Sequence, residues 1–227
     1  MEKPLATTEA ECQRLISAAK NNNVTLLVGH IEQFNPAVEQ MHKILSDTSK
    51  ICSLTAQRMS AASGRITDVD VHVSMDFMIH AVEVIQSLVK SPVVNVQASA
   101  VKTPSSPKGK DYITALVEFE NGVTANITAS RITQARVRTL SVTTDTNYID
   151  MDFINQSINV HTQGRMPYVN QEEIPEWMHY GLKGSVEQLF IPTNQPLQAE
   201  LNHFLNCVRG KETPRITGES ALNVHCA

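Results

Sequence analysis

Four polar side chains recur on one face of a segment that is otherwise strongly apolar. The segment from Ser74 to Lys90 has the period of a helix, and apolar residues surround most of its circumference. Helical spacing puts the polar side chains on one narrow stripe: Asp76, His80, Glu83 and Ser87. An imidazole held by a carboxylate one turn away is suited to moving a hydroxyl proton near neutral pH. The pattern therefore indicates acid/base chemistry on this helix.

Two other interpretations of the same residues stay open. His80 could be a core histidine whose hydrogen bonds are satisfied inside the protein, with Asp76 as its partner. Alternatively, His72, Asp76 and His80 are each four residues apart and could ligate a metal ion, as in a metal-dependent enzyme. The residues from Val71 to Val73 are expected to precede the helix. His72 would therefore not lie on the same helical face as Asp76 and His80. We therefore predict no metal site.

The N-terminal part of the chain predicts a helix followed by a buried strand. Thr8 and Glu11 form a capping box at the start of a helix with apolar residues on one face. The run Val24 to Val28 then has large apolar residues at four of five positions, as in a parallel sheet covered on both faces. Since the later strands have hairpin spacing, we expect the parallel partners of this run to lie in a segment that the chain lacks.

The rest of the chain predicts an α+β fold. A helix is expected from Phe34 to Leu45, and Ser60–Val73 is expected to be a loop. Asn121-Gly122 marks a hairpin. Thr162 to Asn194 should form a long loop, followed by a last helix from Leu197 to Val208. The expected strands are 51–59, 93–101, 112–120, 123–131, 137–143, 148–153 and 158–161. We predict a mostly antiparallel open sheet of about six strands with helices on one face.

Composition excludes several classes of protein. The chain has 227 residues, a net charge of −4 and no basic cluster, which argues against a nucleic-acid partner. No apolar stretch is long enough for a membrane span, so no membrane partner is expected. The four cysteines are far apart and form no C-x-x-C pair, which favours a reduced cytoplasmic setting over a disulfide framework.

Several short motifs occur in an order that resembles the Gfo/Idh/MocA family of glucose-fructose oxidoreductase and inositol dehydrogenase relatives. The resemblance covers essentially the whole chain, and the combination is more specific than any single motif. The motifs are Glu2-Lys3-Pro4-Leu5-Ala6, Gly29-His30, Phe34-Asn35-Pro36, Asp76-x-x-Ile79-His80, Asn121-Gly122, Pro196-Leu197, Glu200-Leu201, Phe204, Gly218-Glu219 and Ala221-Leu222.

The resemblance implies an N-terminal Rossmann domain that binds NAD or NADP, followed by a domain for substrate binding and oligomerisation. No Gly-x-Gly-x-x-Gly occurs among the nine glycines, so no phosphate cradle is expected. We predict that residues 1–33 are the C-terminal remnant of the Rossmann domain and that residues 34–227 form the substrate domain. The chain alone is not expected to bind the dinucleotide tightly or to be active.

The resemblance also implies roles for particular residues. Lys3 would lie beside the nicotinamide ribose and the reacting carbon, His80 would be the general acid/base, and Asp76 would contact substrate or tune that histidine. The cofactor edge would be formed by Glu2, Lys3, Pro4 and His30. One departure is that Ala81-Val82-Glu83 follows the histidine where Asp-x-Asp is commonest in the family. Another is that Gln33 stands where arginine is frequent.

The class of substrate is predicted from charged residues that precede the Ser74 to Lys90 helix. Arg58 and Arg65 could pair with a phosphate or carboxylate, and this stretch resembles family members acting on UDP-N-acetylglucosamine. We predict an NAD(P)-dependent oxidoreductase acting on a hydroxyl or carbonyl of a sugar, cyclitol or nucleotide-sugar. The alternative is a non-catalytic substrate-binding or dimerisation module. A homodimer or homotetramer is expected through the open sheet face, which we predict to be rich in Val, Ile and Thr.

Overall fold

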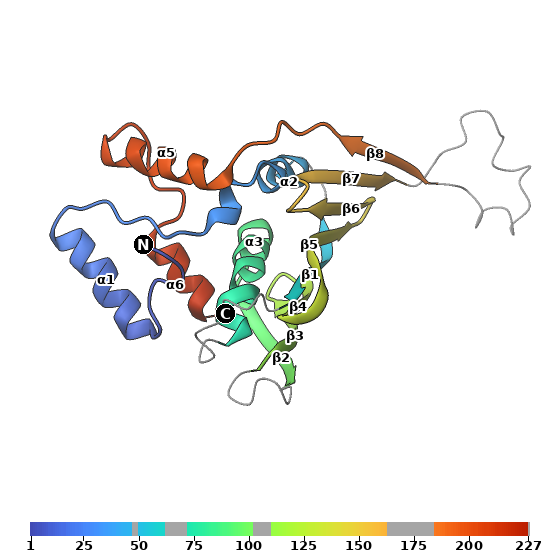
Figure 1. The fold of residues 1–227 in the computed structure, drawn as a ribbon, viewed down its shortest axis with the longest axis horizontal. Helices are drawn as coiled ribbons and strands as arrows, with labels where there is room; N and C mark the ends of the chain where they lie inside the picture. The colour runs from blue at the N-terminus through green and yellow to red at the C-terminus, as the bar shows by residue number, and fades with distance from the viewer. Residues whose placement is uncertain (47–49, 62–71, 102–109, 163–183, 227) are drawn as a thin grey trace, which may run out of the picture.

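A single sheet organises the structure (Figure 1). The computed structural model describes residues 1–46, 50–61, 72–101, 110–162 and 184–226. Within these residues eight strands run in the order β2-β3-β4-β1-β5-β6-β7-β8. All neighbours are antiparallel except β1 and β4, which are parallel. The strands are β1 Ile51–Ala61, β2 Val93–Val101, β3 Tyr112–Phe119, β4 Thr124–Ser130, β5 Ile132–Thr144, β6 Asn147–Asp152, β7 Ser157–Thr162 and β8 Ser185–Leu189.

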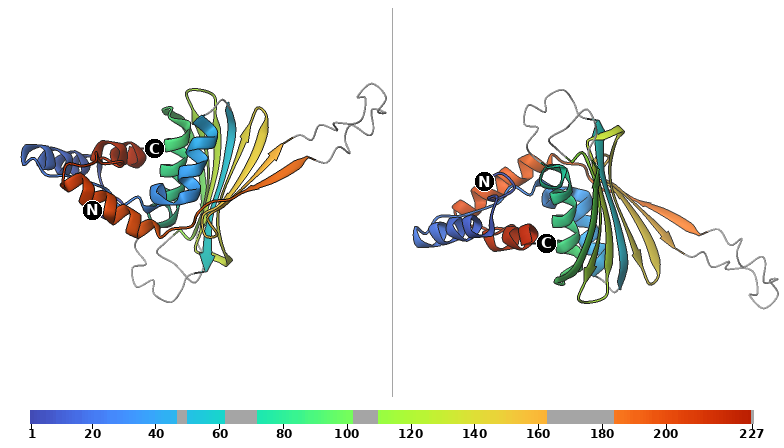
Figure 2. Two further views of the ribbon diagram at one scale, coloured as in Figure 1. Left: turned by 90° about the horizontal axis from the view of Figure 1, so that it is seen from above. Right: turned by 90° about the horizontal axis from the view of Figure 1, so that it is seen from below.

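Helices cover one face of this sheet, which confirms the predicted α+β fold. Helices α2 (Pro36–Ser46) and α3 (Ile79–Val89) lie against the sheet in both views of Figure 2, and no helix of the described residues lies on the opposite face. Buried and exposed side chains alternate along the strands, and the buried ones form the core beneath the helices. In β3, for example, Ile113, Ala115, Val117 and Phe119 are buried. The helix that carries the polar stripe thus packs directly against the sheet.

The uncovered face is more polar than the sequence pattern predicted. The strand register sends most of the Val and Ile side chains of β1, β4 and β5 toward the helices. On the other face Ser141 donates a hydrogen bond of 2.8 Å to Asp150, which lies 3.2 Å from His161. Leu116 and Tyr148 are exposed. Hydroxyl and amide side chains therefore dominate a face that we had expected to be rich in Val, Ile and Thr, so the threonines agree with that expectation and Val and Ile do not.

A second, smaller core joins the two ends of the chain. It packs helix α1 (Glu9–Asn21) with helix α6 (Gly218–Cys226), and its buried members are Leu5, Cys12, Ile16, Val28, Phe34, Ile216 and Ala221. Gly218 permits this approach, because a Cβ there would lie 2.6 Å from Ile16 Cγ1. The first 33 residues thus pack with the C-terminal helix. The domain boundary at residue 33 stays a prediction.

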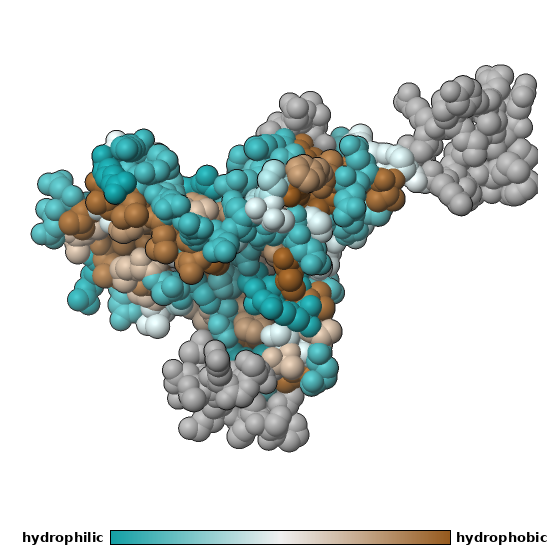
Figure 3. Space-filling model, turned by 45° about the horizontal axis from the view of Figure 1, so that its top comes forward, coloured by the Kyte–Doolittle hydropathy of each residue, from teal (hydrophilic) through white to brown (hydrophobic). Residues whose placement is uncertain are grey.

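Helix α5 (Pro196–Val208) exposes an apolar stripe. Leu197, Leu201, Leu205 and Val208 are all about half exposed, and apolar side chains gather on this lobe of the molecule (Figure 3). No helix among the described residues is both long and apolar enough to cross a membrane.

Local predictions were mostly confirmed where side-chain chemistry fixes the backbone. Thr8 and Glu11 form the predicted capping box. Asn121-Gly122 makes the β3–β4 turn, with Gly122 at a φ of 85°. Ser60 and Ala61 continue β1 instead of beginning a loop, while residues 62–71 of that predicted loop lie outside the described residues.

Predictions that depended on distant partners were less successful. Val24–Val28 forms no strand, and the bridge next to it is an isolated parallel one between Glu2 and Gly29, just after the run. A strand needs a continuous ladder of hydrogen bonds to a neighbour. Conversely, β8 lies inside the predicted long loop and is stabilised by pairing with β7. Residues 163–183 of that predicted loop lie outside the described residues.

Candidate functional site

Lys3 reaches across the molecule to the start of the helix that carries the polar stripe. Its Nζ donates hydrogen bonds to the backbone oxygens of Asp76 at 2.8 Å and Met75 at 3.4 Å. The Asp76 carboxylate lies 3.7 Å from the same nitrogen. This first turn, Ser74–Met78, is a π-helix labelled η2, and such turns are frequent at functional sites. Residues 73 positions apart are therefore brought into direct contact.

His80 follows the π turn and faces a small polar pocket. The pocket has a volume of about 100 Å³ and is lined by Arg58, Met59, Asp76, Phe77, His80 and Arg138. Strands β1 and β5 supply the two arginines and Met59, while the helix supplies the other three residues. The site is thus built between the sheet and the helix that covers it.

The surroundings of His80 keep its imidazole neutral. Burial and the nearby charges of Arg58, Lys3, His30 and Arg138 lower its pKa to about 2. Its Nδ1 is buried and has no hydrogen-bond partner among the described residues. The interpretation of His80 as a fully satisfied core histidine is therefore wrong at this atom. A neutral imidazole in a polar pocket can accept a proton from a hydroxyl group.

The predicted pairing of Asp76 with His80 is replaced by a different contact. Among the described residues the Asp76 carboxylate pairs with Lys3, and no hydrogen bond joins it to His80. The physical reason is the π turn, since its wider winding changes the direction of side chains four residues apart.

Further along the helix, the polar stripe no longer faces the pocket. Ser87 donates to Val84 O at 2.7 Å and lies 3.2 Å from His42 Nε2 on α2, away from the pocket residues. Only the first two members of the predicted stripe line the pocket.

The predicted cofactor residues converge beside Lys3. Glu2 bridges Gly29, and Pro4 follows Lys3 through a cis peptide bond. His30 is 1% exposed, and its Nδ1 has no partner among the described residues. Burial, followed by the charge of Lys3, lowers the pKa of His30 to about 4. Lys3 and His30 are thus close enough to interact and border the same region.

The N-termini of α1 and α6 do not fit the pyrophosphate of a dinucleotide. A pyrophosphate needs free backbone N–H groups at a helix N-terminus or glycine-rich loop. The N-terminus of α1 is already capped by Thr8 and has Glu9 and Glu11 in its first turn. That of α6 has Glu219, which pairs with Lys20 at 2.6 Å. Lys3 and His30 could border a nicotinamide, but neither of these two helix N-termini offers a pyrophosphate cradle.

Arg58 is anchored by a buried ion pair. Its Nη2 lies 2.8 Å from Glu32 Oε1, and both side chains are less than a tenth exposed. Asn35 Nδ2 donates to the other Glu32 oxygen at 3.3 Å. The guanidinium carbon of Arg58 lies 5.9 Å from the centre of the Phe153 ring. Arg58 therefore lines the pocket in a fixed orientation. The other predicted substrate residue, Arg65, lies outside the described residues.

Glu83 is a buried carboxyl group that stays protonated near neutral pH. Burial raises its pKa from 4.5 to about 8, with a smaller contribution from Glu32 and an opposing one from Gln33. The folded protein thus holds this proton more tightly than the unfolded chain. The stability contributed by Glu83 is fully present below pH 4.5 and is lost as pH rises through about 8.

Glu83→Gln should remove this pH dependence, because glutamine copies the protonated carboxyl group. Near pH 4.5 the variant should be about as stable as the wild type, and by pH 8 it should be more stable by about 2–4 kcal/mol. Urea unfolding at pH values between these limits measures the difference. Glu120→Gln, at an exposed site, is the matched control and should leave the pH profile unchanged. Parallel profiles for wild type and Glu83→Gln would contradict an assignment of the buried proton to Glu83.

The metal alternative gains no support from the described residues. His72 is exposed and precedes the helix. No group of three or more His, Cys, Asp or Glu side chains in the described ranges is arranged to hold a metal ion.

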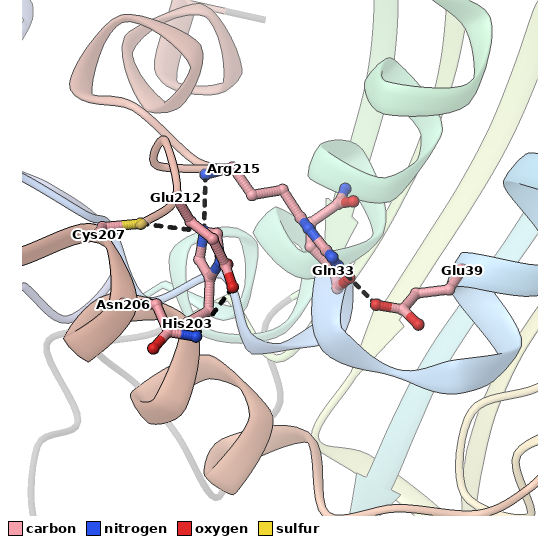
Figure 4. A network of polar contacts seen from close by, with 7 residues as sticks. All are labelled: Gln33, Glu39, His203, Asn206, Cys207, Glu212 and Arg215. Carbon is pink, nitrogen blue, oxygen red and sulfur yellow. Dashed lines mark hydrogen bonds and ion pairs between the residues drawn. The ribbon is translucent and has the colours of Figure 1, made fainter. Parts of the chain in front are cut away.

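A polar network that the sequence did not predict ties the C-terminal segment to the site (Figure 4). His203 Nε2 accepts a hydrogen bond of 3.0 Å from Arg215 N, so its proton lies on Nδ1, which faces Glu212. Arg215 in turn donates to Gln33 O at 2.9 Å and Glu39 Oε1 at 2.6 Å. The network anchors the short 3-10 helix η1 (Ile31–Phe34), which carries Glu32 and begins next to His30. No sequence signal linked positions so far apart.

Comparisons with known proteins agree with this architecture. Residues 53–149 match the GFO/IDH/MocA C-terminal domain. Over this segment the chain is similar to the Gfo/Idh/MocA family. It is 26% identical over 213 residues to a UDP-N-acetylglucosamine 3-dehydrogenase of Acidithiobacillus ferrooxidans, covering 92% of this chain and 61% of that protein. The solved structure of that enzyme matches with a TM-score of 0.84 and 25% identity, covering 99% of this chain and 67% of the other.

Two further proteins are similar to the chain. A 1-carboxy-3-chloro-3,4-dihydroxycyclohexa-1,5-diene dehydrogenase of Comamonas testosteroni is 27% identical over 140 residues, covering 57% of this chain and 35% of that protein. An aldose-aldose oxidoreductase from Caulobacter crescentus shares the fold, with a TM-score of 0.79 at 19% identity, covering 99% of this chain and 66% of that one. The chain spans about three-fifths of the length of the first curated relative.

Proposed function

We propose that this chain supplies the substrate-binding and proton-transfer groups of an NAD(P)-dependent oxidoreductase. The substrate would be a hydroxyl or carbonyl group of a sugar, cyclitol or nucleotide-sugar. The observation that carries the proposal is the contact of Lys3 with the π turn that leads directly into His80. Similarity to a UDP-N-acetylglucosamine 3-dehydrogenase and fold likeness to an aldose-aldose oxidoreductase support the substrate class.

The proposed roles follow from charge and position. Neutral His80 accepts the hydroxyl proton during oxidation and returns it during reduction. Lys3, held by Asp76 and two backbone oxygens, orients the group that reacts. Arg58 is fixed by Glu32 and orients the substrate from the sheet side. A nicotinamide would supply hydride acceptance, which is chemistry of the cofactor and not of these residues.

Two measurements test the proposal. Calorimetric titration of the purified chain with UDP-N-acetylglucosamine, an aldose and a cyclitol should reveal binding of one substrate class. Turnover is measured on the chain joined to the Rossmann domain that the family resemblance implies: the absorbance of reduced nicotinamide, followed after adding NAD⁺ or NADP⁺ with the ligand that binds, should then report oxidation. Absence of binding by all three classes, together with absence of turnover, would count against the proposal.

A non-catalytic binding module is the second candidate. The observation that favours it is that acidic side chains occupy the N-termini of α1 and α6, where a pyrophosphate would need free N–H groups. Saturable binding of a sugar ligand without turnover when the chain is joined to the Rossmann domain that the resemblance implies would support this candidate over the enzyme.

We also propose that the uncovered face of the sheet forms a homodimer or homotetramer. Its support is the absence of covering helices together with exposed Leu116 and Tyr148. Light scattering at micromolar concentration should give a mass of two or four chains, and Leu116→Lys should shift that mass toward the monomer. A monomeric mass for the wild-type chain would contradict this expectation.

A further inference from the structure

Two arginines lie directly opposite each other on the helix-covered face of the sheet. In the antiparallel pair of β1 and β5, Arg58 is the register partner of Arg138. The same face continues into the apolar core, where Ala56 opposes Leu140. Like charges directly opposite each other destabilise a sheet. The arrangement is therefore unfavourable unless negative charge lies close to it.

Among the described residues the negative charge of the site does not balance its positive charge. Glu32 pairs with Arg58, and Asp76 pairs with Lys3, so these two carboxylates are already used by the other two cations of the group. Burial lowers the pKa of Arg138, and the charges of Arg58 and Arg136 lower it further. Both histidines are neutral near pH 7, since the pKa of each is lowered. Counted over the described residues, Arg138 therefore adds a positive charge to a partly desolvated pocket.

Arg58 also presents a buried donor to this region. Its Nη2 is used by Glu32, whereas its Nη1 is buried and has no hydrogen-bond partner among the described residues. A buried guanidinium nitrogen without a partner is costly, and most such groups are satisfied in native proteins. Arg58 is 6% exposed, so few positions can supply its acceptor. The pocket that both arginines line is one of them.

We propose that the pocket binds an anionic oxygen group, a carboxylate or a phosphoryl group, between Arg58 and Arg138 and next to His80. Naming this group as part of the substrate rests on the proposed function. The planar guanidinium fork matches the oxygens of either group. A cavity of about 100 Å³ is large enough to hold such a group.

Binding of an anion would also change how readily His80 accepts a proton. The cations Arg58, Lys3 and Arg138 all disfavour its protonated form. An anion held between two of them offsets their charge and strengthens His80 as a proton acceptor. A substrate with an anionic group would thus activate the base by occupying the subsite, whereas a neutral substrate would leave the base weak.

Anion titration of the purified chain tests the subsite without cofactor or turnover. Inorganic phosphate and acetate are titrated separately at constant ionic strength, and binding is measured by calorimetry. Wild type should bind at least one of them saturably, and Arg138→Gln should weaken that affinity at least about tenfold, as expected for loss of one charge-assisted hydrogen bond. Arg136→Gln removes the same charge from an exposed site outside the pocket and should change affinity less than about twofold.

Each outcome bears on the subsite. Preference for phosphate assigns a phosphoryl group, and preference for acetate assigns a carboxylate. No saturable binding to wild type, or equal loss in Arg138→Gln and Arg136→Gln, would overturn the proposal. If Arg138→Gln does not fold, Arg138→Lys retains the charge, loses the fork and should still bind more weakly. Anion binding by the chain, together with no substrate turnover when the chain is joined to the Rossmann domain that the resemblance implies, would leave the subsite standing and contradict the oxidoreductase function instead.

Discussion

Replacing Arg58 with methionine should destabilise the protein by about 3–5 kcal/mol, because it leaves the Glu32 carboxylate buried without its cation. Methionine is long enough to occupy much of the space along β1, so loss of packing should be a minor part of the effect. Glu32 would keep only its 3.3 Å hydrogen bond from Asn35 Nδ2. Urea unfolding of the variant and wild type at pH 7 measures the difference in the free energy of unfolding.

A double-mutant cycle separates the ion pair from packing. Glu32→Gln removes the buried negative charge, so Arg58→Met combined with Glu32→Gln should be less destabilised than the sum of the single variants by about 1–3 kcal/mol. Arg138→Met is the matched control, because it truncates the opposite arginine without leaving a buried carboxylate unpaired. Strict additivity of the two single effects would show that the contact between Arg58 and Glu32 is not what stabilises this region.

The fold could be predicted from the sequence where a local pattern determines it. Alternation of apolar residues located β2 with its observed bounds, and Asn121-Gly122 located the β3–β4 hairpin. The β8 strand has exposed residues at most of its positions, so its five residues carry no alternation that could reveal it. Pairing with β7 stabilises it instead. Such an edge strand depends on contacts that are distant in sequence.

The site was predictable in its residues but not in its contacts. Helical spacing singled out Asp76 and His80, and the family resemblance singled out Lys3. Neither indicated that a π turn would direct the Asp76 carboxylate to Lys3 instead of His80. Arg138 was missed because its significance comes only from register, which places it opposite Arg58. Sequence patterns report the preferences of single elements, whereas these contacts arise between elements.

His80→Gln should lower the rate of hydroxyl oxidation by about 100- to 10,000-fold, the usual contribution of a positioned acid/base group. Glutamine remains neutral and polar in the pocket but cannot accept the hydroxyl proton. Since wild-type His80 is already neutral, the substitution changes little of the charge around Arg58 and Arg138. Substrate binding should therefore change by no more than a few-fold while kcat falls, which separates lost proton transfer from lost binding.

His42→Gln provides the matched control for this prediction. His42 is partly buried, and its hydrogen-bond partner Ser87 lies on the same helix as His80, two turns further along and outside the pocket. The same chemical change there should leave kcat within a few-fold of wild type. Equal loss in both variants would point to disturbance of the packing between α2 and α3. Full activity of His80→Gln with normal substrate binding would instead assign proton transfer to another group, and Lys3 is the first alternative because it holds the π turn beside the pocket.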